Sequence, residues 1–385
     1  MKLNNLSKYT EVDREKQALI SNALPKVEVR QKIFYSKGEA FSDFDLVEEC
    51  CYDAMPVDLE KTKVCPKCGR KYSESELFCF DCAVSLKDIE NVNVKEIEVK
   101  HDFAYEGDNS FDGFSDILTE DNLARMADFE FGSQDFADIV KSIKLQALKN
   151  LDAAVKSNNI DMNSLSVLEK VILFTKSFVN VEYKAYGPEL GFYRFNTIFV
   201  DDRQLDALQI TTMLHELTHF LLKEILAQIL CRLLDTSKTK EIESIATFIL
   251  SYSAENCLID EYAAHTVEGR FTLIGYQDYS SFLNIQKTIK RPDEEIEMLK
   301  TIGNSFANVV KDIVESFIND DLLEEIKNQF RMDIMDEPNY SQLRLENCTL
   351  LNGEGFFKAL EFILVDGFAV SMDNAEKLSE IGEMW

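Results

Sequence analysis

The sequence of 385 residues is poor in positive charge, histidine, proline and glycine. Its 41 Lys and Arg stand against 69 Asp and Glu, which gives a formal net charge of -28. Because phosphate groups are bound by clustered cations, this balance argues against nucleic acid or an anionic membrane as the main partner. It favours a protein or peptide that is not itself acidic. With only 14 glycines and 6 prolines, the chain has neither a collagen-like nor a low-complexity composition.

Long apolar runs are also missing. The most hydrophobic stretch, residues 220–234, is interrupted by Lys223, Glu224 and Arg232, so it does not meet the requirement for a membrane-spanning helix. No apolar segment follows the first residues, MKLNNLSKYTEVDREKQ, and we therefore expect no export signal and a cytoplasmic protein. In that compartment the nine cysteines are expected to be thiols or metal ligands and not disulfides.

The apolar residues that are present suffice for a substantial core, since 45% of the chain is hydrophobic. They recur at helical spacing over residues 133–157 and 163–183, and helices are also expected over 240–269, 281–290, 293–331 and 356–371. Residues 191–203 alternate like a strand, which we interpret as half of a hairpin. The predicted fold class is α+β, mostly helical, with one small sheet.

Four of the cysteines form two knuckles in the stretch CPKCGRKYSESELFCFDC. Cys65 and Cys68 make the first CxxC, and Cys79 and Cys82 make the second after ten residues. Each knuckle directs two thiolates at one ion, so the spacing fits tetrahedral zinc and resembles a zinc ribbon. Four thiolates leave no open coordination position, which makes this a structural site. The alternative is a set of unpaired or redox-active cysteines.

The segment around these knuckles is basic in an otherwise acidic chain. It carries Lys61, Lys63, Lys67, Arg70 and Lys71, whereas residues 95–138 are strongly acidic. The ribbon could dock an acidic or nucleic-acid partner, or it could pack against the acidic stretch of its own chain. We favour the second interpretation because the overall charge opposes nucleic-acid binding.

The stretch TTMLHELTHFLL contains two of the four histidines, His215 and His219, with Glu216 between them. On a helix, positions four residues apart lie on one face one turn apart, the separation at which two imidazoles can bind one zinc ion. Glu216 then lies beside the open coordination position, where it could act as general base in amide hydrolysis. The alternative is a buried apolar helix whose histidines are merely hydrogen-bonded.

The next helical stretch, SYSAENCLIDEYAAHTVEGR, contains the candidates for the third metal ligand. The continuation HxxGxxH is absent after the first motif. At 100° per residue, Glu261 and His265 differ by 40°, whereas Glu255 lies 120° from Glu261. We choose Glu261 as the ligand, with His265 as a supporting or transition-state group, and keep Glu255 as the alternative ligand. Cys257 is interpreted as a small core thiol, although it could ligate zinc in a latent state.

Together, a strand, then HELTH, then a helix carrying EYAAH resemble gluzincin-type metallopeptidases, and most closely the ImmA/IrrE group. The resemblance covers about residues 120–270 and rests on these two motifs. It implies a zincin-like domain in which Glu261 is the third ligand and Ala264 is the family's alanine. His265 stands where the family usually has Asn or Asp, so it could help to hold the ligands or could bind the oxyanion.

The resemblance also implies a function. In that family the substrates are typically helix-turn-helix transcriptional repressors, cleaved once in response to DNA damage, mobile-element or phage-defence signals. We therefore expect a zinc-dependent endopeptidase that performs regulatory cleavage of a protein partner. In zincin-like sites an edge strand binds the substrate backbone, and the strand at 191–203 could do so with Tyr193 or Arg194 near the cleft. The alternative is a catalytically silent, zinc-stabilised scaffold that acts by protein–protein binding.

These motifs predict five parts of the chain. They are an N-terminal segment (1–60) with only a helix over 7–22 readable, the zinc ribbon (61–90), an acidic linker (91–118), the metallopeptidase core (119–275) and a helical extension (276–385). We expect two zinc ions, one catalytic and one structural, and no membrane contact. Nucleic acid is expected to bind at most weakly, through the basic ribbon.

Overall fold

The computed structural model describes residues 63–65, 71–72, 78–79, 82, 84–85, 87–88, 93–100, 113–128, 132–183, 191–194, 196–272, 281–334 and 350–383. The N-terminal segment 1–60, with the helix expected over 7–22, lies outside the described residues. Cys68 also lies outside them.

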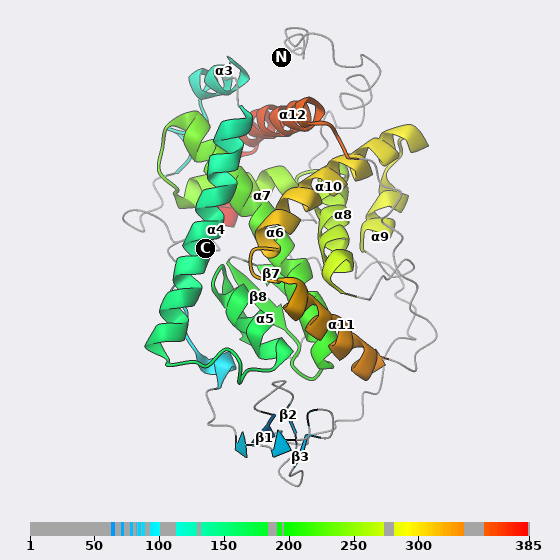
Figure 1. Ribbon diagram of the computed structural model, residues 1–385. Coiled ribbons are helices and arrows are strands. Elements are labelled where there is room, and N and C mark those ends of the chain that lie inside the picture. The colour runs from blue at the N-terminus through cyan, green and yellow to red at the C-terminus, as the bar shows by residue number, and fades with distance from the viewer. Residues whose placement is uncertain are drawn as a thin grey trace.

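Helix α6 (Asp206–Leu234) runs through the middle of the molecule (Figure 1), and nearly all its side chains are buried. Helices α5 (Val167–Lys176), α7 (Lys240–Ser251) and α8 (Ala254–Phe271) pack directly against it. Helix α10 (Asp293–Val314) packs in turn along α8. A helix buried on all sides keeps water away from any polar group on its faces.

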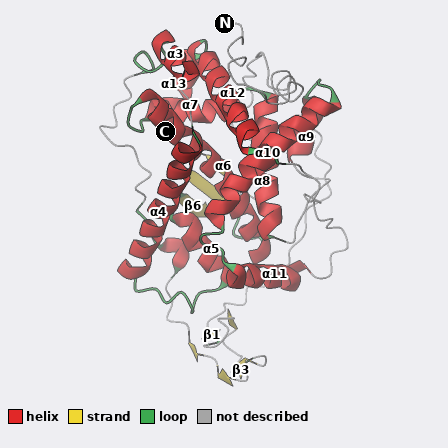
Figure 2. Ribbon diagram, turned by 45° about the horizontal axis from the view of Figure 1, so that its top comes forward, coloured by secondary structure: helices red, strands yellow, loops and turns green. Residues whose placement is uncertain are grey.

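The remaining helices surround this centre: η3 (Val94–Glu96), α3 (Glu120–Asp128), α4 (Ser133–Ser157), α9 (Ser281–Thr288), α11 (Asp320–Ile334), α12 (Gly353–Met372) and α13 (Ala375–Glu383). Buried side chains from Val94 to Ile381 belong to one hydrophobic core. The expectation of a mostly helical α+β protein with a small sheet is confirmed, and Figure 2 shows how little of the helical body is strand.

Two long helices of the sequence interpretation are each divided in the structure. The stretch 240–269 breaks between α7 and α8, where the Ser253 hydroxyl accepts a hydrogen bond from the Asn256 N–H. The stretch 293–331 breaks between α10 and α11, where the Asn319 side chain accepts from the Leu322 N–H. Both residues cap the start of the following helix, which favours a new helix over a continued one.

The sheet consists of β6 (Asn180–Tyr183), β7 (Gly191–Arg194) and β8 (Thr197–Val200), in the order β6-β8-β7. Strand β6 is parallel to β8, and β7 is antiparallel to it. The helix expected over 163–183 was wrong in its second half, because α5 ends at Lys176 and β6 follows. The single strand expected over 191–203 is itself a hairpin, since Asn196 adopts φ 57° between β7 and β8.

Strand β7 lies tightly against α6. A Cβ atom on Gly191 would come 2.3 Å from the carbonyl oxygen of Phe199 and 2.5 Å from the methyl group of Thr212. No other residue therefore fits at Gly191 without displacing the strand. Because Thr212 lies three residues before His215, this close approach places the outer strand of the hairpin beside the histidine motif.

Part of the predicted acidic linker packs on the helical core. Val94, Ile97 and Val99 are buried. The ammonium group of Lys176, at the end of α5, donates to the carbonyl oxygens of Val94, Lys95 and Ile97 at 3.3, 2.6 and 2.9 Å. Residues 93–99 are thereby fixed to the body that holds the histidine motif. Within the described residues, no helix combines the length and apolar character needed to cross a bilayer.

Candidate metal sites

The first candidate site is built on α6 and α8. His215 and His219 lie one turn apart on α6, and their Nε2 atoms are 3.1 Å apart. Glu261 approaches from α8, with Oε2 3.6 Å from Nε2 of His215 and Oε1 3.7 Å from Nε2 of His219. Tetrahedral zinc with bonds of about 2.0–2.2 Å separates its ligands by about 3.3–3.5 Å. The three side chains are therefore spaced as one metal ion requires.

The imidazoles of His215 and His219 each have a carboxylate next to the Nδ1 atom. Glu268 Oε2 lies 2.8 Å from Nδ1 of His215, and Asp260 Oδ2 lies 2.9 Å from Nδ1 of His219. Negative charge beside Nδ1 favours a proton on that atom, which leaves the lone pair of Nε2 for a metal. The two Nε2 atoms, 3.1 Å apart, therefore share either a proton or a metal ion between them.

The electrostatics of this cluster also favour a cation. Burial disfavours a charged imidazole, but Glu261, Glu268 and Glu216 outweigh burial and raise the pKa of His215 well above its ordinary value. Burial would likewise raise the pKa of Glu268, but His265 and His215 lower it to about 2. The Glu268 carboxylate thus retains its charge and makes the site attractive to a positive ion.

Glu216 completes the motif on α6. Its side chain is buried, and its Oε2 atom has no hydrogen-bond partner among the described residues. Ligand atoms of His215, Glu216 and His219 all lie within 4.8 Å of one another. A buried carboxylate oxygen without a partner is costly, so the residues present fit a metal ion and a polar molecule bound beside it.

His265 reaches the same cluster from α8. Its ring centroid lies 4.5 Å from that of His215. Its Nδ1 is 3.1 Å from Oε1 of Glu268, and its Nε2 is 3.0 Å from the hydroxyl of Ser281 on α9. His265 thus lies beside the candidate metal ligands, with both ring nitrogens in contact with polar groups. Whether it acts in a transition state stays a prediction.

The other candidates from the sequence lie elsewhere. Glu255 Oε1 is 3.4 Å from Nε of Arg291, so this glutamate faces a surface arginine. The thiol of Cys257 lies 3.6 Å from the carbonyl oxygen of Ser251. Neither residue belongs to a metal-capable group in the described part of the chain. The ring of Tyr193 packs edge-on against Phe220 at 6.2 Å, as a half-buried strand aromatic does.

Sequence reasoning missed the roles of Asp260, Glu268 and Ser281. Asp260 directly precedes Glu261 and Glu268 lies on the same helical face as Glu261, but the two motifs assign neither residue to a histidine. The sequence does place Glu268 near the site, because it follows Glu261 by seven residues, or about two helical turns. Ser281 lies on a different helix, and its contact depends on tertiary packing.

A second buried charge cluster follows on α6, one turn beyond His219. Lys223 Nζ contacts Oδ1 of Asn196 at 2.6 Å and Oε2 of Glu243 at 2.5 Å. Lys238 Nζ lies 2.6 Å from both Glu224 and Glu243. Because Asn196 forms the β7–β8 turn, this lysine cluster ties the hairpin to α6 and α7.

The second candidate metal site lies in short strands: β1 (Lys63–Val64), β2 (Lys71–Tyr72), β3 (Phe78–Cys79), β4 (Val84–Ser85) and β5 (Lys87–Asp88). The strands form two antiparallel sheets, β2-β1-β5 and β3-β4.

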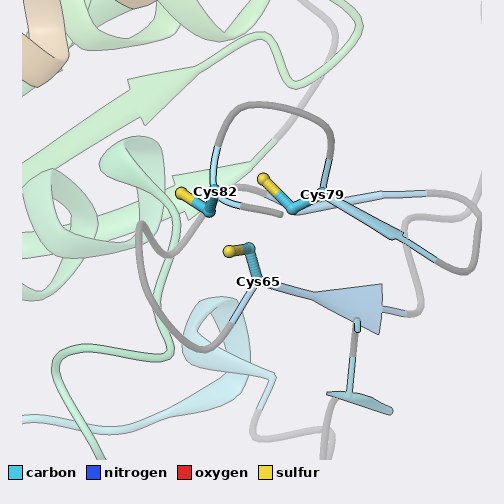
Figure 3. A group of neighbouring side chains, drawn as sticks. All are labelled: Cys65, Cys79 and Cys82. Carbon is cyan, nitrogen blue, oxygen red and sulfur yellow. The ribbon is translucent and has the colours of Figure 1, made fainter. Parts of the chain in front are cut away.

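Figure 3 shows Cys65, Cys79 and Cys82 gathered in one place, with Cys65 directly after β1 and Cys79 at the end of β3. Their sulfur atoms all lie within 4.8 Å of one another, so this triad could hold a metal ion. The Tyr72 hydroxyl lies 2.9 Å from Sγ of Cys79. The fourth expected ligand, Cys68, is outside the described residues.

Comparisons with models of protein families, with curated proteins and with solved structures return no match. The resemblance to metallopeptidases therefore rests on the two sequence motifs, and the structure adds that their side chains could hold a metal ion.

Proposed function

We propose that this protein is a zinc-dependent endopeptidase that performs regulatory cleavage of a protein partner. The observation that carries the proposal is the position of Glu216. A purely structural metal site needs ligands only, yet here a further carboxylate is buried next to the two histidines with one oxygen lacking a partner in the described structure. A general base for hydrolysis has this position and this chemistry.

Different residues of the site would have different roles in peptide hydrolysis. His215, His219 and Glu261 would hold zinc, which when bound supplies the Lewis acidity that activates a peptide carbonyl and a water molecule. Glu216 would accept a proton from that water as its oxygen attacks the carbonyl carbon. The same proton would then pass to the leaving amide nitrogen as the C–N bond breaks, which restores the carboxylate.

A peptide substrate would have a binding edge beside this site. Strand β7 forms one edge of the three-stranded sheet and packs on α6 through Gly191. An extended peptide can add to such an edge through main-chain hydrogen bonds. The net charge of -28 favours a substrate that is not acidic. A helix-turn-helix repressor, the substrate class implied by the resemblance, is the specific partner that we propose.

The proposal is tested with zinc-loaded full-length protein and a library of quenched fluorescent peptides. The wild type should cleave a subset of peptides, and Glu216→Gln should keep its zinc but lose about 10²–10⁴-fold in rate, the usual contribution of a general base. Equal cleavage by both proteins would identify a contaminant and reject Glu216 as the base. No cleavage by either, with zinc bound to both, would favour the zinc-stabilised scaffold.

A further inference from the structure

Ser281, the first residue of α9, contacts two groups of the histidine site at once. Its hydroxyl lies within hydrogen-bond distance of Oε2 of Glu261 and 3.0 Å from Nε2 of His265. Its backbone N–H donates to the same Nε2 at 3.2 Å. Neither motif on α6 or α8 includes this serine. It therefore connects a third helix to the site.

The donors and acceptors fix the direction of these hydrogen bonds. A backbone N–H can only donate, so Nε2 of His265 is an acceptor and its single lone pair is used. The ring proton then sits on Nδ1, where Glu268 accepts it at 3.1 Å. With Nε2 occupied, the hydroxyl proton of Ser281 is directed to the carboxylate of Glu261, which can only accept when ionised.

We propose that Ser281 is a positioning residue for the metal ligand Glu261, acting at the end of a chain that runs from Glu268 through His265 to Ser281. This inference rests on the proposed metal site and extends it. Glu268 contacts Nδ1 of His215 through its other oxygen. One buried carboxylate thereby orients a ligand on α6 directly and a ligand on α8 through two intermediates.

Such a chain explains why His265 and Ser281 lie together. The Ser281 hydroxyl gives the Glu261 carboxylate a donor from α9, and metal-binding side chains depend on such outer contacts for their orientation. Loss of one outer contact commonly weakens metal binding by about 10–100-fold. The serine thus matters for affinity at the histidine site and is not expected to affect the cysteine site.

The test measures zinc affinity at the histidine site of the full-length protein by competition with a chelating indicator. Ser281→Ala should weaken binding about 10–100-fold, while Ser281→Thr, which keeps the hydroxyl, should stay within a few fold of wild type. Ser251→Ala is the matched control, because the Ser251 hydroxyl donates to the Thr247 carbonyl of its own helix. Absorption of the cobalt-substituted protein should change for Ser281→Ala and not for the control.

A double-mutant cycle distinguishes the chain from separate effects. If His265 acts through Ser281, then His265→Ala combined with Ser281→Ala should weaken zinc binding little more than the stronger single change. Additive losses would overturn the chain, and an unchanged affinity and cobalt spectrum for Ser281→Ala would overturn the role of the serine. If the wild type itself holds no zinc at His215 and His219, the proposed function fails together with this inference.

Discussion

Helix α6 carries two buried charge clusters that lie one turn apart and differ in how their charge is balanced. In the lysine cluster, Lys223 and Lys238 face Glu224 and Glu243, so the charges cancel within the protein. In the histidine site, three imidazoles stand among four carboxylates: Glu216, Asp260, Glu261 and Glu268.

The difference separates a structural cluster from a binding site. Buried charges persist when they are paired, so the lysine cluster needs nothing from outside. The histidine site has imidazoles where the lysine cluster has ammonium groups, and its two Nε2 atoms, 3.1 Å apart, can share either a proton or a metal ion. We therefore expect mutations in the lysine cluster to change mainly the folding stability, and mutations in the histidine site to change mainly the metal affinity.

The largest expected effect is on the lysine cluster. Lys223→Met should destabilise the fold by about 3–5 kcal/mol, because Glu243 would remain buried with one partner fewer. The double change Lys223→Met with Glu243→Met restores charge balance and should recover much of the loss. Chemical denaturation of both variants measures this. A single variant as stable as wild type would show that the lysine cluster is not a buried, balanced unit.

The same cluster should stabilise the protein over a wide pH range. Burial alone would raise the pKa of Glu243, but Lys223 and Lys238 lower it below its ordinary 4.5. The stabilisation that comes from Glu243 is complete above about pH 4.5, and it is lost as the pH falls through the lowered pKa. Burial would lower the pKa of Lys238, but Glu224 and Glu243 raise it above 10.5, so its contribution lasts until pH exceeds 10.5. The advantage of wild type over the double variant, measured by denaturation at each pH, should shrink at both extremes.

The carboxylates behind the imidazoles should affect metal binding more than folding. Glu268→Gln or Asp260→Asn should each weaken zinc binding at the histidine site by about 10–100-fold, since each supports one ligand histidine. Competition with a chelating indicator gives the affinities, and zinc at the cysteine site serves as an internal control. Unchanged affinity in both variants would remove these carboxylates from the site.

The smallest effect is expected at Glu255, the alternative third ligand from the sequence. It pairs with the part-exposed Arg291, and such pairs contribute about 0–1 kcal/mol. Glu255→Gln should therefore leave zinc content unchanged and stability nearly so, whereas Glu261→Gln should lower zinc affinity at the histidine site. Zinc analysis of both proteins compares the two glutamates directly, and a loss confined to Glu255→Gln would reverse the assignment.

The spacing of apolar residues along the sequence predicted those features that depend on residues close together in the chain. Helix α4 has the bounds expected from its periodicity, Ser133–Ser157. The face shared by His215 and His219 follows from helix geometry, which also places Glu261 and Glu255 on different faces of α8.

Features that depend on single residues or on packing could not be predicted in the same way. The left-handed backbone at Asn196 turns one expected strand into a hairpin. The contacts of Glu268 with His215 and of Ser281 with Glu261 join different helices. Periodicity says which face a residue occupies and not which helix meets it.

If the proposed site exists, His215 and His219 bind a metal ion in addition to any ion held by the cysteine site. Zinc per chain should be measured on purified wild type and on the double variant His215→Ala with His219→Ala. We predict two zinc ions in the wild type and one in the variant, with Glu216→Gln retaining two. The same zinc content in wild type and double variant, after zinc loading, would contradict the proposed site.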